Sequence, residues 1–100
     1  MPSSKRQLRL TASARRDLQT IADYTNRTWG AAQKSRYLAD LKATLTGLTA
    51  TPEIGTPRDD LQMGLRTHPA GRHIIFYRLS PTHLTILRIL HKSMEPERHV

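Results

Sequence analysis

Arginine and histidine supply most of the reactive chemistry in this sequence. They gather in the C-terminal third, around apolar runs, as Arg66, Arg72, Arg78 and Arg88 with His68, His73 and His91. Guanidinium groups can stabilise a phosphorane and imidazoles can move protons, which together is the chemistry of metal-free RNA cleavage. The same side chains also bind acidic groups. Because no carboxylate or tyrosine stands out as a committed base, the pattern favours binding over catalysis.

Other reactive centres are not indicated by the sequence. The five histidines form no His-Glu-x-x-His pattern and no close group with carboxylates that would hold zinc. There is no Gly-x-Ser-x-Gly turn, and Gly64 and Gly71 flank a predicted strand instead of opening a helix as in a phosphate-binding loop. The chain has no cysteine, which excludes thiolate chemistry and disulfides. We therefore predict neither a metal nor a cofactor.

The charge of the chain is its most unusual bulk property. Sixteen Lys and Arg residues against eight Asp and Glu residues give a formal net charge of +8. Such a surface attracts nucleic acid, an acidic protein, or a protein machine that already holds nucleic acid. A basic surface without a specific ligand is the alternative, and charge alone does not choose among these partners.

Length and composition set the limits of the fold. One hundred residues predict a single domain over residues 1–100 with a modest core. No apolar run approaches the roughly 18 residues that cross a bilayer, so we expect no membrane contact. The N-terminal MPSSKRQLRL has no apolar segment behind its charges, so we expect no secretory signal. With no cysteine present, this favours a cytoplasmic protein.

The N-terminal half is predicted to form a short strand and two helices. Residues 8–10 alternate as a strand does, and Thr11 or Ser13 can cap the helix that follows. The apolar positions of each helix recur at spacings of three and four. They are Ala14, Leu18, Ile21, Ala22 and Thr25, then Tyr37, Leu38, Leu41, Leu45 and Leu48. The first helix should end at Trp29-Gly30, with Trp29 in the core of an antiparallel hairpin, and the second at Thr51-Pro52.

The C-terminal half is predicted to be a sheet. After an irregular loop at 52–64, strands are expected at 65–68, 72–79 and 83–91, with turns at 69–71 and 80–82. Simple alternation places Leu84, Ile86 and Leu90 on one face of the last strand and Leu87 and Ile89 on the other. One helical hairpin covers one face, so we expect a protein partner to bury the second. The alternative is that a strongly curved sheet and the loop at 52–64 wrap the second face.

Four segments of the chain resemble one known family. They are TASARRDLQTIADYT, TWGAAQ, GLRTHPAGRHIIFYR and ILRILHKSMEPERH, and they span nearly the whole sequence. Together with the order of elements, they are similar to the ParE toxins of the ParE/RelE superfamily. The resemblance implies an α+β fold, in which an N-terminal strand and an antiparallel helical hairpin pack on a three- to four-stranded antiparallel sheet. It also implies a toxin that blocks DNA gyrase and so replication, and that binds a ParD-type antitoxin as a hetero-oligomer, without sequence-specific DNA binding of its own.

The resemblance leaves a second activity open, that of the RelE branch, whose members cut messenger RNA on the ribosome. Arg72, Arg88 and His91 could serve such a ribonuclease. However, the tail KSMEPERHV contains no tyrosine, and the loop at 52–64 lacks the lysines of some RelE-type enzymes. A gyrase inhibitor that is not an enzyme is therefore the first interpretation, and an inert basic binding module is a third.

Two sets of residues follow from the toxin interpretation. The basic residues of the sheet and tail are expected to contact the target, namely Arg72, Arg78, Arg88, His91, Lys92 and Arg98. Apolar residues of the helices and sheet are expected to contact the antitoxin, namely Leu41, Leu45, Ile75, Tyr77 and Ile86.

Overall fold

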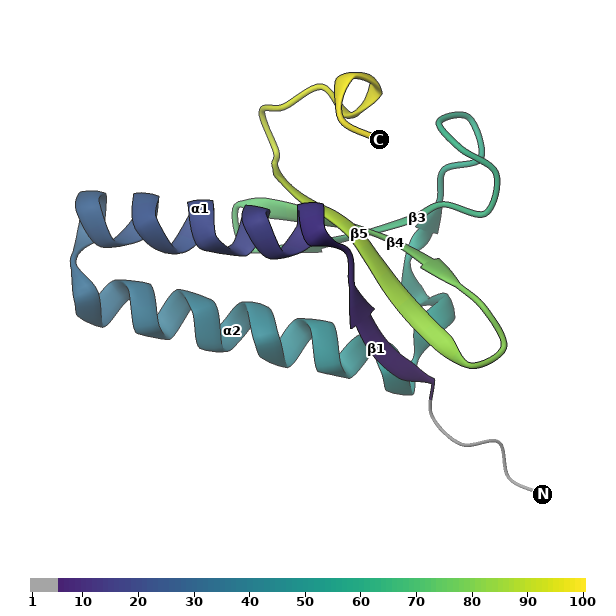
Figure 1. Cartoon of the computed structure of the whole chain (residues 1–100), viewed down its shortest axis with the longest axis horizontal. Helices are drawn as coiled ribbons and strands as arrows, with labels where there is room; N and C mark the ends of the chain where they lie inside the picture. Colours follow the sequence, from purple (N-terminus) through teal and green to yellow (C-terminus); the bar gives the residue numbers. More distant parts are fainter. Residues whose placement is uncertain (1–5) are drawn as a thin grey trace.

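The computed structural model describes residues 6–100 as two long helices beside a twisted sheet (Figure 1). The strands are β1 (Gln7–Leu10), β2 (Thr56–Pro57), β3 (Arg66–Ala70), β4 (His73–Leu79) and β5 (His83–His91). The α-helices are α1 (Ala12–Trp29) and α2 (Ala31–Ala50), and two short 3-10 helices are η1 (Pro52–Ile54) and η2 (Pro96–Arg98). The predicted order of elements is confirmed. None of the helices in the described part of the chain is both long and apolar enough to cross a bilayer.

The sheet is mixed, with the strand order β1-β5-β4-β3-β2. The hairpins β3-β4 and β4-β5 are antiparallel, as predicted, whereas β1 pairs in parallel with β5 from Gln7 opposite His83 to Leu10 opposite Ile86. The two-residue strand β2 adds a fifth strand that the proline-containing loop sequence did not reveal. The antiparallel strands β3, β4 and β5 are therefore extended by β2 at one edge and by the parallel strand β1 at the other.

The helical hairpin is defined by its ends. Thr11 caps α1, since its hydroxyl accepts from the Ala14 N–H at 3.0 Å. Gly30, with φ of 92°, is the single residue between the two helices, and its N–H donates to the Asn26 carbonyl at 2.9 Å. A residue with a Cβ rarely adopts this φ, so Gly30 ends α1 and reverses the chain. The two helices therefore lie antiparallel (Figure 1).

The main core lies between the helices and one face of the sheet. Both helices contribute their apolar stripes, and β4 and β5 contribute alternate residues. Its buried members are Ala14, Ile21, Leu41, Leu45, Leu48, Ala70, Ile75, Tyr77, Leu84, Ile86 and Ile89. The Tyr77 hydroxyl is satisfied within this core, because it donates to the Pro52 carbonyl at 2.7 Å and accepts from the Gly55 N–H at 2.9 Å.

The second face of the sheet is covered by the protein's own chain. Leu65, Phe76 and Leu90 are buried there, and they are packed by Leu61 and Val100, with Ile74 and Leu87 alongside. The expectation that a partner must bury this face is therefore wrong, and coverage by the loop, the alternative, is correct. The C-terminal residue completes the cover, which the sequence pattern did not indicate.

A β-bulge changes which side chains of β5 face the helices. The register pairs Phe76 with Arg88 but Tyr77 with Ile86, so Leu87 is the extra residue. Beyond the bulge the alternation is reversed. Ile89 therefore joins Leu84 and Ile86 in the main core, and Leu87 and Leu90 lie on the second face. The prediction from simple alternation was wrong for Ile89 and Leu90 because it assumed an uninterrupted strand.

The β3-β4 turn is shorter than predicted. Pro69 and Ala70 belong to β3, and Ala70 pairs with His73, which leaves Gly71 and Arg72 as the two turn residues. Gly71 has φ of 59°, the positive value needed at the first position of a type II′ hairpin turn. A Cβ at Gly71 would also lie 2.7 Å from Cε1 of Tyr37, so a glycine is required here for two reasons.

Candidate functional site: a cleft between the helices and the sheet

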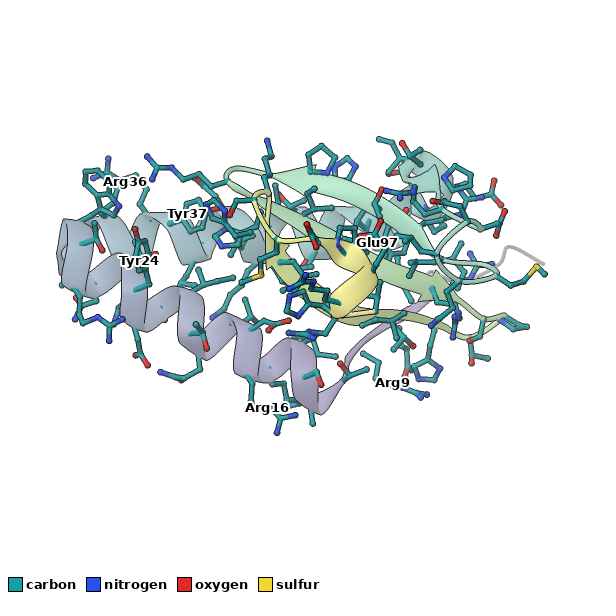
Figure 2. The ribbon with its side chains drawn as sticks, turned by 90° about the horizontal axis from the view of Figure 1, so that it is seen from above. Arg9, Arg16, Tyr24, Arg36, Tyr37 and Glu97 are labelled. Carbon is teal, nitrogen blue, oxygen red and sulfur yellow. The ribbon has the colours of Figure 1, made fainter. Side chains whose placement is uncertain are left out.

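An open cleft of about 790 Å³ separates the helical hairpin from the β3-β4 turn and the end of β5. Figure 2 shows Tyr24 on α1 and Tyr37 on α2, which both line it. Its other lining residues come from the two helices, the β3-β4 turn, the start of β4, the end of β5 and the segment after β5. They are Asp17, Thr20, Ile21, Thr25, Arg27, Trp29, Gln33, Gly71, Arg72, His73, Ile89, His91 and Met94.

Three large apolar side chains of the cleft are open to solvent. Tyr24 is 54% exposed, Trp29 is 55% exposed and Met94 is 46% exposed. The prediction that Trp29 belongs to the core was wrong, because the last residue of α1 lies where the helices extend past the sheet (Figure 1). The Arg72 guanidinium lies 5.3 Å from the centre of the Trp29 ring, a cation–π arrangement. The cleft therefore combines exposed apolar surface with positive charge.

Tyr37 organises the polar side of the cleft. Its hydroxyl lies 2.6 Å from Nδ1 of His73 and 3.3 Å from the Ala70 carbonyl, and it accepts from the Arg72 N–H at 2.9 Å. These contacts tie α2 to the two-residue turn. The sequence pattern predicted Tyr37 only as part of the apolar stripe of α2, and its ring does lie against the core.

Two histidines meet edge to face beside Tyr37. The ring centres of His73 and His91 are 5.4 Å apart. Burial lowers the pKa of His73 to about 4, and the nearby His91 ring and Arg72 guanidinium act in the same direction. His91 is exposed, and its Nδ1 accepts from the Ser93 N–H at 3.1 Å and lies 2.8 Å from the Ser93 hydroxyl. At neutral pH His73 is therefore an uncharged partner of Tyr37.

Asp17 lines the cleft and forms an ion pair with Arg88 of β5. The guanidinium donates to both carboxylate oxygens, at 2.8 and 2.9 Å, and the Ile89 N–H donates to the same carboxylate at 2.9 Å. The carboxylate also raises the pKa of Arg88. Asp17 is the only acidic residue that lines the described cleft, and its charge is matched within the fold.

The predicted target-binding residues fall into separate groups. Arg72 and His91 line the cleft, and the Lys92 N–H beside them donates to the Arg72 carbonyl at 3.1 Å. By contrast, Arg78 bonds the Gln62 side chain and the Met63 carbonyl in the loop after β2, and Arg98 pairs with Glu95 at 3.0 Å. The structure thus brings three of the six together.

The three residues considered for a ribonuclease are not equivalent in the structure. Arg72 and His91 share the cleft, but Arg88 is engaged by Asp17 and donates to the His99 carbonyl at 3.1 Å.

Among residues 6–100, no group of three His, Cys, Asp or Glu residues could hold a metal ion.

The five residues expected to contact an antitoxin are structural. Leu41, Leu45, Ile75, Tyr77 and Ile86 are at most 2% exposed and form the main core. In this fold they offer no surface to another protein, because the helices and the sheet bury them against each other. The exposed large apolar residues that line the cleft are Tyr24, Trp29 and Met94, and none of them was among the predicted antitoxin contacts. The only indication of this surface in the sequence was that Tyr24, a large aromatic residue, lies beside the apolar stripe of α1 and not within it.

The fold is that of a small α+β protein that also occurs in solved structures of toxin–antitoxin systems. A chain of the chromosomal ParDE toxin–antitoxin system from P. aeruginosa superposes with a TM-score of 0.76 at 22% identity, over 87% of this chain and 96% of that one. A chain of the RelBE2 toxin–antitoxin complex from Mycobacterium tuberculosis gives a TM-score of 0.69 at 25% identity, over 89% of this chain and 100% of that one.

The sequence comparisons then show the family. The model of the ParE toxin of the type II toxin–antitoxin system parDE matches residues 8–96. The toxin ParE1 of Caulobacter vibrioides is 35% identical over 92 residues, which cover 92% of this chain and 95% of that toxin. The toxin ParE of Escherichia coli is 36% identical over 88 residues, which cover 86% of this chain and 84% of that toxin. The chain therefore belongs to the ParE family of type II toxin–antitoxin toxins.

Proposed function

We propose that this protein is the toxin of a ParDE-type pair, that it inhibits DNA gyrase and so blocks replication, and that direct binding of a ParD-type antitoxin neutralises it. The observation that carries the proposal is the match to the ParE family model over residues 8–96. The structural neighbours from toxin–antitoxin systems support an antitoxin partner. In this proposal the protein works in the cytoplasm by binding, without a cofactor.

The cleft supports the antitoxin part of the proposal. Exposed apolar side chains usually mark an interaction site, and aromatic residues commonly dominate the energy of protein interfaces. Tyr24, Trp29 and Met94 supply such a surface, and Arg27 and Arg72 give it positive charge. A partner segment with apolar and acidic residues would bury the first and neutralise the second.

The basic residues near the cleft support the target part of the proposal. Arg72, His91 and Lys92 lie where β5 ends and the β3-β4 turn begins, and the net charge of the chain is +8. Gyrase that holds DNA presents an anionic surface, and cationic side chains speed association with such a surface. We assign these three residues to target binding, ahead of Arg78, Arg88 and Arg98, which are engaged within the fold.

RNA cleavage on the ribosome is the second candidate. It is favoured by one observation, that Arg72 and His91 line the same cleft. The engagement of Arg88 by Asp17 weakens it, because that guanidinium is already matched by a carboxylate.

Controlled expression in a bacterium separates the two candidates. A gyrase inhibitor should induce the DNA damage response and filamentous growth while protein synthesis continues at first. A ribosomal ribonuclease should stop protein synthesis early and leave transcripts cut within codons. Harmless expression of a folded protein would contradict both.

A further inference from the structure

The contacts of Tyr37 with the β3-β4 turn carry the further inference. This side chain of α2 touches both turn residues and the pair that closes the turn (Figure 2). Its hydroxyl lies 2.6 Å from Nδ1 of His73 and 3.3 Å from the Ala70 carbonyl. It also accepts from the Arg72 N–H at 2.9 Å. A Cβ on Gly71 would lie 2.7 Å from the ring, so the ring packs closely against the turn backbone as well.

The backbone of Arg72 is held from outside its own hairpin. Ala70 and His73 form the last pair of the β3-β4 ladder, so the Arg72 N–H lies beyond the bonds between these strands. Tyr37 supplies an acceptor for it from α2. The Arg72 carbonyl accepts from the Lys92 N–H at 3.1 Å, in the segment after β5. Both backbone groups of this arginine are therefore fixed by other elements of the fold.

The charged end of Arg72 is also placed by the helical hairpin. Its guanidinium lies 5.3 Å from the centre of the Trp29 ring, and Trp29 is the last residue of α1. Ordering a side chain with many rotamers opposes binding, so a side chain that is ordered beforehand binds with a smaller loss of entropy. Arg72 is thus pre-organised in the cleft, where we assign it to target binding.

The single proton of the Tyr37 hydroxyl has two acceptors within reach. The distance to Nδ1 of His73 is the shorter by far, at 2.6 Å against 3.3 Å to the Ala70 carbonyl. Because the pKa of His73 is lowered to about 4, its ring is neutral at pH 7 and carries one proton, on Nε2. The hydroxyl then donates to Nδ1 and keeps a lone pair for the Arg72 N–H. His73 therefore orients the hydroxyl, and the hydroxyl orients the turn.

We infer that Tyr37 is a positioning residue for target binding, which holds the β3-β4 turn so that the Arg72 guanidinium meets the target from a fixed place. The inference rests on the target part of the proposed function. The Tyr37 hydroxyl is occupied by groups of the turn, so it needs no contact with the target itself. Its contribution to toxin action should therefore depend on Arg72.

A double-mutant cycle in the full chain tests this dependence. Tyr37→Phe and Arg72→Ala are made singly and together, and the amount of expressed toxin that halves bacterial growth is measured for each. Tyr37→Phe should require about threefold to tenfold more toxin than the parent, the range expected for losing the order of one long side chain. In the Arg72→Ala background the same change should matter by less than about twofold, because interacting residues are not additive.

Two measurements on the free toxin separate positioning from stability. In Tyr37→Phe the Arg72 amide should exchange with solvent at least about fivefold faster than in the parent. The nitrogen NMR shift of Nδ1 of His73 should also move, since it loses its donor. Tyr77→Phe is the matched control, because it removes a tyrosine hydroxyl bonded to two backbone groups outside the cleft. It should lower the unfolding temperature and change the toxin requirement by less than about twofold.

The outcomes distinguish the inference from the proposed function. Equal losses from Tyr37→Phe in both backgrounds, no loss in either, or an unfolded Tyr37→Phe protein would overturn the positioning role. Unchanged exchange at the Arg72 amide would do the same. A plasmid cleavage assay with purified gyrase is run on the same four proteins. Growth inhibition that follows the cycle without any effect on gyrase would support the positioning role and contradict only the proposed target. A parent toxin that is folded and harmless would overturn both.

Discussion

Asp17 on α1 and Arg88 on β5, 71 residues apart in the sequence, form a two-point ion pair that joins the first helix to the last strand. Because the same carboxylate accepts from the Ile89 N–H, it also ends the pairing of the sheet edge and marks where the cleft begins. One side chain thus fixes α1 to both the side chain and the backbone of the last strand.

Removing this carboxylate should destabilise the protein. Asp17→Ala leaves a half-buried guanidinium and a backbone N–H without their acceptor, which should lower the free energy of unfolding by about 2 to 4 kcal/mol. Urea unfolding followed by circular dichroism measures the change. Asp23→Ala, which removes an exposed carboxylate bonded only to Gln19 on the same helix, is the control and should cost less than about 0.5 kcal/mol. Equal effects of the two variants would show that the ion pair is not structural.

Two glycines should respond to alanine in opposite directions. A Cβ at Gly55 would overlap the buried Tyr77 hydroxyl and lie 2.8 Å from Cε1, so Gly55→Ala should destabilise by about 1 to 3 kcal/mol. Gly47 is within α2 and has open space around it, so Gly47→Ala should stabilise by about 0.5 to 1 kcal/mol. Thermal unfolding of the two variants beside the parent checks both signs. A stable Gly55→Ala protein would contradict the packing of Tyr77 against this turn.

The pH dependence of stability should report His73. Its pKa is lowered to about 4 in the folded protein, below the ordinary value of 6.5. The unfolded chain therefore binds more protons between these values, and stability should fall as the pH drops from about 6.5 towards 4. His73→Gln should remove this contribution, so the variant should lose less stability than the parent between pH 7.5 and pH 5. A titration of the His73 ring by NMR with a midpoint near 6.5 would refute the assignment.

Loss of the Arg72 cation should weaken toxin action without unfolding the protein. Its side chain lies over the exposed Trp29 ring, an interaction of about 0.5 to 1 kcal/mol at such sites, so Arg72→Ala should remain folded. We expect about tenfold more of this variant to be needed for the same effect on gyrase. Arg9→Ala makes the same charge change on β1, outside the cleft, and serves as the matched control. Equal losses in the two variants would indicate a general effect of net charge.

Much of the fold was predictable because local signals marked its boundaries. Gly30 and Pro52 limit the second helix, Thr11 caps the first, and the apolar run from His83 to His91 predicted β5 with its observed limits. The sheet edges were harder to predict. The parallel pairing of β1 depends on a contact with a strand more than 70 residues away, for which the local pattern carries no signal.

The candidate site was predicted only in part. The sequence identified Arg72 and His91, because charged residues around an apolar strand are visible in a linear pattern. It misplaced Trp29, since burial of the last residue of a helix depends on how far the helix extends past the sheet. It also selected Tyr77 as a contact residue, although this tyrosine is the largest buried side chain in the core. The bulge at Leu87, which decides what faces the cleft, depends on the register between two strands.

The most direct test of the proposed function is a plasmid assay with purified gyrase, ATP and the free toxin. The reaction is stopped with detergent and protease and scored for linear DNA. The proposal predicts linear plasmid that requires both gyrase and toxin, and that disappears when the antitoxin is added first. Unchanged supercoiling without linear DNA, from a toxin shown to be folded, would contradict gyrase as the target and favour the ribosome.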